Sequence, residues 1–311
     1  MTKGMFFIAG STATGKSDIA AEVSHELDAE IVGADAFQIY RGFELLTAKP
    51  DPATLARAPH HLIGSVPTSE AMDVEKFRRL ALGVIGEIHS RRKPAIIVGG
   101  SGLYVKALTH GLTNLPKGDA KLRAQLDELT LAQLQKKLAD LDPEAIGRID
   151  FKNRRRVERA IEICLLSGKR FSKLLSGVGG SGAPGSTISV IANGVFVFRD
   201  REDLYQRINR RVEEMFERGV SEEVRAATSM SLTASQMIGL REIRELIEGK
   251  ISTVQCVAAI QQATRRYAKR QLTWFRRQTS FQPLNLSLLT HQEAVKWISQ
   301  KARFALAQGN D

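Results

Sequence analysis

The stretch of sequence that decides the fold is MFFIAGSTATGKS, residues 5–17. Its first five residues are all apolar, which predicts a strand buried on both faces of a parallel sheet. The next eight match G-x-x-x-x-G-K-[ST], and apolar residues then recur at helical spacing, at Ile19, Val23 and Leu27. A buried strand, a glycine-bounded loop and a helix in this order predict a phosphate-binding loop, or P-loop.

This loop has the chemistry of a diphosphate site. Glycines allow backbone N–H groups to turn toward phosphate oxygens, and the helix N-terminus adds the positive end of its dipole. Lys16 supplies a mobile cation, and the Ser17 hydroxyl is a candidate Mg²⁺ ligand. The loop binds phosphates whatever is attached to them, so ATP is only the default ligand. The predicted diphosphate-binding residues are Gly10, Ser11, Thr12, Ala13, Thr14, Gly15, Lys16 and Ser17.

Strands and helices alternate along the first third of the chain. Residues 31–34 and 95–98 are short apolar runs that predict two more strands, and apolar spacing between 74 and 88 predicts a helix. The alternation predicts an α/β fold, with a P-loop NTPase-like parallel sheet flanked by helices. An apolar run at 190–198 predicts a strand that rejoins the sheet, and we expect the residues after it to be helical.

The middle of the chain has a different pattern. From 116 to 173 it is rich in Leu, Lys, Arg, Glu and Ala with helical periodicity, which predicts an all-helical insertion domain. Residues 175–186 are rich in glycine, which predicts a flexible loop and a boundary. We therefore expect a first core segment at 1–114, the insertion at 115–187, and completion of the core with basic C-terminal helices at 188–311.

Composition excludes several classes of protein. With 43% hydrophobic and 25% charged residues, the chain of 311 residues is typical of soluble globular proteins, and its apolar runs are far shorter than the roughly 20 residues of a membrane span. Its two cysteines lack paired spacing, so we expect neither a disulfide framework nor a zinc site. We assign no metal to the adjacent His60 and His61, and we expect a cytoplasmic protein with no membrane partner.

Asp35 is the candidate catalytic residue outside the P-loop. It follows the predicted strand at 31–34, and the carboxyl ends of parallel strands meet at the ligand-binding edge of an α/β sheet. A carboxylate at this edge can hold Mg²⁺ through water or act as a general base. Aspartate is also common as a helix cap or turn former, but the position of Asp35 relative to the P-loop favours a functional role.

Basic residues cluster in two parts of the chain, whose formal net charge is +11. One cluster spans 152–159. The other lies between 249 and 292, where there is no acidic residue and seven Lys and Arg surround three aromatic residues, Tyr267, Trp274 and Phe275. A charge run is usually a solvated face, but basic runs without acids and with interleaved aromatic residues favour a nucleic-acid backbone as partner.

Taken together, these segments resemble the tRNA dimethylallyltransferase (tRNA isopentenyltransferase) family of bacterial type, over nearly the whole chain. Three residues depart from the family pattern: Ser11 replaces a usual proline, Gly33 a serine and Gly64 a common aspartate. The matching blocks are residues 10–17, 34–42 (ADAFQIYRG), 47–50 (TAKP), 60–63 (HHLI), 98–104 (VGGSGLY), 153–162, 238–239 and 267–276 (YAKRQLTWFR).

The resemblance implies that the P-loop holds dimethylallyl diphosphate rather than ATP, with Mg²⁺ as cofactor. It implies transfer of the dimethylallyl group to N6 of the adenosine at tRNA position 37, next to the anticodon. Asp35 matches the catalytic aspartate, and Thr14 and Ser101 match positions near the reacting groups, where a hydroxyl donates to an anionic oxygen. Arg207 or Arg211 is expected to stabilise the leaving diphosphate.

The resemblance also implies that a monomeric enzyme binds the tRNA anticodon stem-loop. The target base must leave its stack to reach a buried carboxylate, and Gln38 is expected to read the extruded adenine. Both basic clusters are expected to supply phosphate contacts and stacking. The expected tRNA-binding residues are Asp35, Ala36, Phe37, Gln38, Arg155, Arg156, Val157, Glu158, Arg159, Arg265, Lys269, Arg270 and Arg276.

Three other functions stay open at this point. A P-loop kinase explains the loop and Asp35 but gives the basic, aromatic segment no role. An adenylate isopentenyltransferase, which modifies a free nucleotide, explains both features equally well and needs no polyanion surface. A non-enzymatic nucleic-acid-binding protein leaves the P-loop without a ligand. The net charge separates these functions weakly, whereas the matching blocks favour tRNA modification.

Overall fold

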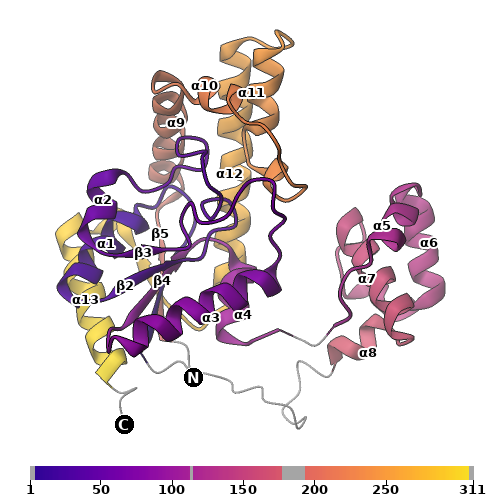
Figure 1. The fold of residues 1–311 in the computed structure, drawn as a ribbon, viewed down its shortest axis with the longest axis horizontal. Helices are drawn as coiled ribbons and strands as arrows, with labels where there is room; N and C mark the ends of the chain where they lie inside the picture. Colours follow the sequence, from indigo (N-terminus) through magenta and orange to yellow (C-terminus); the bar gives the residue numbers. More distant parts are fainter. Residues whose placement is uncertain (1–3, 113–114, 177–192, 308–311) are drawn as a thin grey trace. The chain divides into compact units, whose positions relative to one another are not determined.

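The structure is a computed structural model that describes residues 4–112, 115–176 and 193–307. Contacts divide the chain into two compact units, Met1–Gly111 with Ile188–Asp311, and Leu112–Thr187. The first unit is an α/β core, and the second is helical where it is described (Figure 1). Most of the expected glycine-rich loop, and the first three residues of the strand expected at 190–198, lie outside the described residues.

The core unit is built on a six-stranded sheet whose strand pairs are all parallel, in the order β3-β2-β4-β1-β5-β6. The parallel α/β fold predicted from the sequence is therefore confirmed. Central strand β1 places Ile8 opposite Val98 on one side and Val195 on the other. The strands are β1 (Met5–Gly10), β2 (Glu30–Gly33), β3 (His60–His61), β4 (Ala95–Gly99), β5 (Gly194–Phe198) and β6 (Gln282–Asn285).

The two edge strands have little sequence signal. β3 contains two residues, and β6 contains Pro283, which lacks a backbone donor and is tolerated at a sheet edge. The expectation that the chain is helical after 198 is wrong at Gln282–Asn285, where β6 pairs with β5.

Alternate side chains of β1 point to opposite faces of the sheet. Phe7 and Ala9 join the hydrophobic cluster on one face, and Phe6 and Ile8 join the cluster on the other. Burial on both faces explains why β1 reads as an unbroken apolar run. The core helices are α1 (Lys16–Glu26), α2 (Pro52–Arg57), α3 (Val74–Ser90), α4 (Gly102–Thr109), α9 (Arg201–Glu217), α10 (Val220–Arg225), α11 (Leu240–Ile247), α12 (Thr253–Gln278) and α13 (His291–Ala307).

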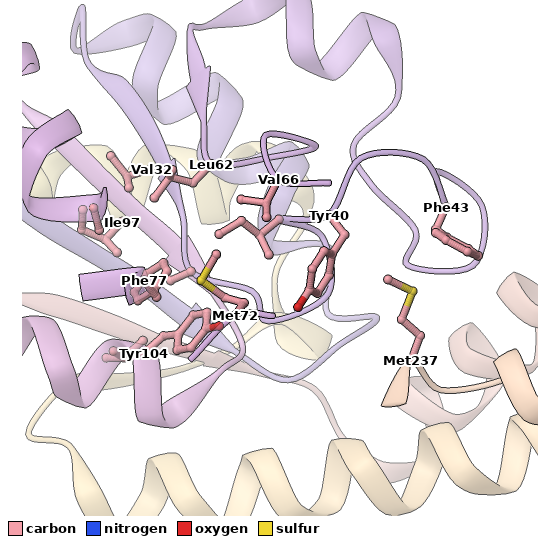
Figure 2. Close-up of a cluster of buried hydrophobic side chains, with 14 of the residues drawn as sticks. Val32, Tyr40, Phe43, Leu62, Val66, Met72, Phe77, Ile97, Tyr104 and Met237 are labelled. Atoms are coloured by element: carbon pink, nitrogen blue, oxygen red, sulfur yellow. The ribbon is translucent and has the colours of Figure 1, made fainter. Parts of the chain in front are cut away.

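The larger cluster extends from the sheet into the segment that follows β2 (Figure 2). There the ring of Phe77 stacks on that of Tyr104, with 3.8 Å between centroids. The side chain of Tyr40 is fully buried, and its hydroxyl shares a hydrogen bond of 2.6 Å with Thr233 Oγ1. These contacts fix the segment that begins at Asp35 against the core.

The second unit has a hydrophobic core of its own, formed by side chains such as Leu134, Leu138 and Val157. Its helices are α5 (Ala120–Asp127), α6 (Leu131–Leu141), α7 (Arg154–Ser167) and α8 (Phe171–Ser176), with a 3₁₀ turn at Pro143–Gly147. Thr130 begins α6 with a capping box to Gln133.

In the parts of the chain that the structure describes, no helix is long and apolar enough to cross a membrane.

Candidate active site at the carboxyl edge of the sheet

The P-loop joins β1 to α1 and requires glycine at two places. Gly10 lies against β5, because a Cβ atom at this position would be 2.4 Å from the carbonyl oxygen of Val197. Gly15 precedes α1 with a φ of +86°, in the left-handed region that favours glycine. The loop therefore turns sharply into the helix, and its last N–H groups lie at the positive end of α1.

Buried hydroxyl groups shape the inside of this loop. The side chains of Ser11 and Thr14 are fully buried, and Thr14 Oγ1 donates to the carbonyl oxygen of Ser11 at 3.0 Å. That bond uses the hydroxyl proton of Thr14. In this structure the hydroxyl holds the turn of the loop, and the expectation that Thr14 donates to the reacting groups stays a prediction that requires this bond to rearrange.

Two cations of the site are held close to the loop. Lys16 Nζ donates to the carbonyl oxygen of Ser11 at 3.2 Å, and burial lowers the pKa of this amine to about 8. Arg211, on α9, donates to Thr12 Oγ1 at 3.1 Å, and burial lowers its pKa to about 10. Both groups lose hydration in this structure, so a bound anion would stabilise their charged forms.

Two more arginines hold the outside of the loop. Arg207 donates to the carbonyl oxygen of Ala13 at 3.0 Å, and Arg199 donates to that of Thr14 at 2.9 Å. Arg199 also forms an ion pair with Asp203 at 2.8 Å. Sequence reasoning did not find Arg199, because its partner in the loop lies 185 residues away in the chain.

Asp35 lies at the end of β2, in the turn that leaves the sheet. Its Oδ1 accepts hydrogen bonds from the backbone N–H groups of Phe37 at 2.9 Å and Gln38 at 3.3 Å. The turn-forming role weighed from the sequence is therefore present. Both bonds go to Oδ1, so the turn itself does not use Oδ2.

Ser101 lies next to this turn, at the end of β4. Its Oγ accepts from the backbone N–H of Ala36 at 2.9 Å. Two of the expected tRNA-binding residues, Ala36 and Phe37, thus use their N–H groups to fix the turn. The Ser101 hydroxyl also hydrogen-bonds with the phenol of Tyr267 on α12.

Gln38 contacts a neighbouring loop. Its Nε2 donates to the carbonyl oxygens of Ala48 at 2.8 Å and Thr47 at 3.2 Å. Both amide protons are used, so a contact to an adenine would have to come from Oε1 or from a rearranged side chain. The same side chain lines a small pocket together with Lys16 and Ser17.

Two residues of α12, Tyr267 and Gln271, also contact the site. Gln271 is buried and accepts from the backbone N–H of Thr12 at 2.9 Å. Tyr267 interacts with Ser101 and Gln271, and burial together with the negative charge of Asp35 raises the pKa of its phenol. The sequence shows Tyr267 and Gln271 four residues apart, a spacing that places them on one helix face.

The basic residues of α12 lie mainly on its outer surface. Lys269, Arg270 and Arg276 are exposed, and the Arg276 guanidinium lies 5.5 Å from the ring centroid of Phe198. Arg265 is half-buried and donates to Asn209 Oδ1 at 3.1 Å. α12 therefore carries a basic surface outside and catalytic-site contacts inside.

The residues expected to bind tRNA from the insertion unit fall into three groups. Arg155 and Arg156 are exposed. Arg159 is engaged within its own unit, where it donates to Glu162 at 2.5 Å and to the carbonyl oxygen of Pro116 at 2.6 Å.

The remaining two residues of this group are part of the insertion fold. Glu158 pairs with Arg154 at 2.5 Å. Val157 is fully buried in the hydrophobic core of the unit, so its expected role as a tRNA contact is wrong in this structure. Its position four residues before Ile161 places it on the apolar face of α7.

His61, the second of the paired histidines, is held within the fold by a buried carboxylate. His61 Nε2 lies 2.7 Å from Glu30 Oε2, and Arg91 donates to the same buried carboxylate at 2.7 Å. Hydrogen bonds from Arg91 and His61 lower the pKa of Glu30. Within the described residues there is no group of three or more His, Cys, Asp or Glu side chains that would hold a metal ion.

Comparison with known proteins decides the family. A family model described as IPP transferase matches residues 38–278. The chain belongs to the IPP transferase family. The chain is 41% identical over 276 residues to a tRNA dimethylallyltransferase of Akkermansia muciniphila, with 88% of this chain and 90% of the relative covered. It is 38% identical over 308 residues to the one of Geobacter sulfurreducens, with 96% and 93% covered.

Solved structures show the same fold. The tRNA isopentenylpyrophosphate transferase of Bacillus halodurans matches with a TM-score of 0.70 and 30% identity, over 99% of this chain and 98% of that one. The corresponding enzyme of Staphylococcus epidermidis gives a TM-score of 0.68 and 29% identity, with 97% and 99% covered. The chain therefore shares its fold with these two enzymes over nearly the full length of each.

Proposed function

We propose that this chain transfers a dimethylallyl group from dimethylallyl diphosphate to N6 of the adenosine at tRNA position 37, next to the anticodon, and releases diphosphate. Family membership supports this activity. The structural observation that carries it is the meeting of two kinds of group at one edge of the sheet. There the cationic P-loop and the Asp35 carboxylate lie close enough for the negative charge of Asp35 to offset part of the lowering of pKa that burial causes in Lys16 and Arg211.

The P-loop side supports departure of diphosphate. As the bond between C1 of the dimethylallyl group and the diphosphate oxygen breaks, negative charge grows on that oxygen. Lys16, Arg211 and the N–H groups at the start of α1 are in place before the reaction begins, so they stabilise this charge without reorganisation. Their poor hydration makes the interaction stronger than it would be in water.

The Asp35 side supports attack by the adenine amine. The lone pair of N6 is delocalised into the ring, so the amine is a weak nucleophile. While the new N6–C1 bond forms, N6 loses one proton, and Oδ2 of Asp35 accepts it. Such general-base assistance contributes roughly 10² to 10⁴ in rate. The backbone bonds to Oδ1 hold the carboxylate in one orientation.

Residues of the P-loop fit Mg²⁺ bound together with the substrate. Ser17 lies in the first turn of α1 beside Lys16 and lines the pocket that leads to Gln38. Mg²⁺ keeps several waters and uses few protein ligands when phosphates are present, so a single hydroxyl is enough. When bound, the metal neutralises charge on the leaving diphosphate.

The outer surface of α12 supports a tRNA substrate. Its exposed Lys269, Arg270 and Arg276 belong to a segment without acidic residues from 249 to 292. Phosphate neutralisation by such residues supplies affinity that depends on salt. We place the reaction in the cytoplasm, where tRNA is present, and take the enzyme to act as a monomer.

The experiment that tests this function supplies labelled dimethylallyl diphosphate and Mg²⁺ to the full chain. Unmodified tRNA is the acceptor in one reaction, and AMP, ADP and ATP are acceptors in parallel reactions. We expect label in tRNA alone. A Lys16→Ala variant, which removes a P-loop cation, serves as the negative control for transfer.

The other outcomes identify the alternatives. Label in free nucleotides alone would assign an adenylate isopentenyltransferase, which needs no polyanion surface. Label in neither acceptor would contradict prenyl transfer and favour a P-loop kinase, to be checked with labelled ATP.

A further inference from the structure

The side chain of Gln271 connects the P-loop to the loop of Gly100 and Ser101, two loops that lie far apart in the sequence. Its Oε1 accepts from the backbone N–H of Thr12 at 2.9 Å, and its Nε2 donates to the carbonyl oxygen of Gly100 at 2.9 Å. Thr12 belongs to the P-loop, and Gly100 precedes Ser101. The Gln271 amide therefore links the P-loop, which is the proposed diphosphate site, to the Ser101 loop, which is proposed to lie beside the acceptor adenosine.

The chemistry of the contact is specific to a primary amide. The backbone N–H of Thr12 is a donor and the carbonyl oxygen of Gly100 is an acceptor. The side chain that bridges them therefore needs one acceptor and one donor at its tip. Glutamate offers no donor when ionised, and methionine offers neither a donor nor a strong acceptor. Because Gln271 is only 5% exposed to solvent, water is poorly placed to replace its amide.

Gly100 is shaped for this bridge. A Cβ atom at this position would lie 2.4 Å from Gln271 Nε2 and 2.9 Å from the carbonyl oxygen of Gly10. Any larger residue would displace the amide or one of the two loops. The absence of a side chain at Gly100 thus lets α12 approach both catalytic loops at once.

One turn before Gln271, on the same face of α12, Tyr267 contacts the loop of Ser101. Tyr267 interacts with Ser101 and with Gln271, and Ser101 in turn accepts from the backbone of Ala36 in the Asp35 turn. On the outer surface, the Arg270 guanidinium lies 5.7 Å from the ring centroid of Tyr267. The helix that presents basic side chains to solvent is therefore in direct contact with the P-loop and the Ser101 loop, and is linked through Ser101 to the Asp35 turn.

We propose that the Gln271 amide is a positioning residue, which fixes the P-loop relative to the Ser101 and Asp35 loops and so sets the distance between the donor carbon and the acceptor nitrogen. This inference rests on the proposed transfer reaction. Gln271 acts through Thr12 and Gly100 and does not take part in bond formation. Misplacement of reacting groups by about 1 Å can cost 10²-fold in rate, which gives the scale of the expected effect.

The test compares Gln271→Met with Gln262→Met, which makes the same change at an exposed position of the same helix. Transfer is measured at saturating tRNA and dimethylallyl diphosphate, and tRNA affinity is measured by filter binding. We expect Gln271→Met to lower kcat about 10²-fold while the KM for dimethylallyl diphosphate and the Kd for tRNA change by less than about threefold. Gln262→Met should match the unaltered chain in each quantity.

A second pair of variants separates positioning from general support of the fold. Gln271→Glu should lower kcat similarly and also raise the KM for dimethylallyl diphosphate, because it adds a negative charge beside the P-loop. Gly100→Ala should reproduce the loss of kcat without any change in α12, which keeps the test informative if Gln271→Met does not fold.

Three outcomes would overturn the inference. They are a kcat for Gln271→Met within about threefold of the unaltered chain, a normal kcat for Gly100→Ala, or a loss of kcat matched by equal losses in both substrate affinities. Failure of the unaltered chain to transfer the prenyl group would instead contradict the proposed function.

Discussion

Positive charge occurs in two settings in the core unit, and the two settings suit different tasks. Lys16 and Arg211 are packed around the P-loop, where burial lowers the pKa of each. Lys269 and Arg270 lie on the outer surface of α12 and remain exposed to water. Poorly hydrated cations interact strongly with charge that develops beside them, whereas hydrated cations give salt-dependent attraction to a polyanion. The first setting suits catalysis of transfer, and the second suits binding of tRNA.

The comparison predicts its largest effect at Asp35, the carboxylate whose charge acts on the partly buried cations of the P-loop. Asp35→Asn keeps Oδ1 as an acceptor for the backbone of Phe37 and Gln38 but removes the base. We expect kcat to fall about 10² to 10⁴-fold, with tRNA affinity nearly unchanged. Single-turnover transfer and filter binding measure the two quantities.

Asp51→Asn is the matched control for this prediction, because Asp51 also accepts a backbone N–H, that of Thr54, at the start of α2. Its turnover should be normal. Equally fast transfer by Asp35→Asn would remove Asp35 from the mechanism.

The next effect tests whether a buried cation acts on the leaving group. Arg211→Met removes the guanidinium that donates to Thr12 Oγ1. We expect kcat/KM for dimethylallyl diphosphate to fall about 10² to 10³-fold, the range found when one preorganised donor is removed. Arg210→Met changes an exposed neighbour on the same helix and should leave kcat/KM intact. Equal losses of kcat/KM in both variants would mean that α9 acts only through its overall positive charge, without a specific role for Arg211.

A third effect concerns pH. The Lys16 amine has a pKa of about 8 in this structure, below the ordinary value of 10.5. It is charged below about pH 8 and loses its charge as the pH rises further. Affinity for an unreactive dimethylallyl diphosphate analogue should therefore be highest below pH 8 and fall by up to about tenfold per pH unit above it.

Titration calorimetry from pH 6.5 to 9.5 measures this dependence. Lys16→Arg keeps its charge over the whole range and should flatten the profile. A profile that stays equally steep in Lys16→Arg would assign the pH dependence to another group.

The smallest effect is expected on the exposed surface. Arg276→Ala should weaken tRNA binding and reduce the slope of log K against log salt by about one unit, as for loss of one phosphate contact. Lys296→Ala removes an exposed charge from α13, which packs with α1 on the opposite face of the sheet, and should leave the slope unchanged. The same slope in both variants would exclude a phosphate contact by Arg276.

Local features of the chain could be predicted well from the sequence. The P-loop depends on consecutive residues, because glycines, a strand and a helix start are all encoded within residues 5–17. Asp35 was found because the end of a buried strand is a local signal, and in the structure it lies beside the P-loop cations. The parallel sheet followed from alternation of apolar runs and helical spacing.

Contacts between distant segments could not be predicted in the same way. Gln271 meets Thr12 across 259 residues, and nothing near either residue in the chain indicates the other. β6 was missed because four residues with an exposed proline have no alternating pattern. Val157 was placed among tRNA-binding residues because it lies within the basic segment 153–162 that resembles the family, although its spacing to Ile161 marks the buried face of α7.

The central claim is that the cationic P-loop and the Asp35 carboxylate act on one prenyl donor and one adenosine of tRNA. The most direct measurement digests tRNA to nucleosides after incubation with labelled dimethylallyl diphosphate and maps the label by mass spectrometry. A tRNA that carries guanosine at position 37 is incubated in parallel. We predict N6-dimethylallyladenosine at position 37 of the first tRNA and no label in the second. Label at other positions, or equal labelling of both tRNAs, would contradict the account.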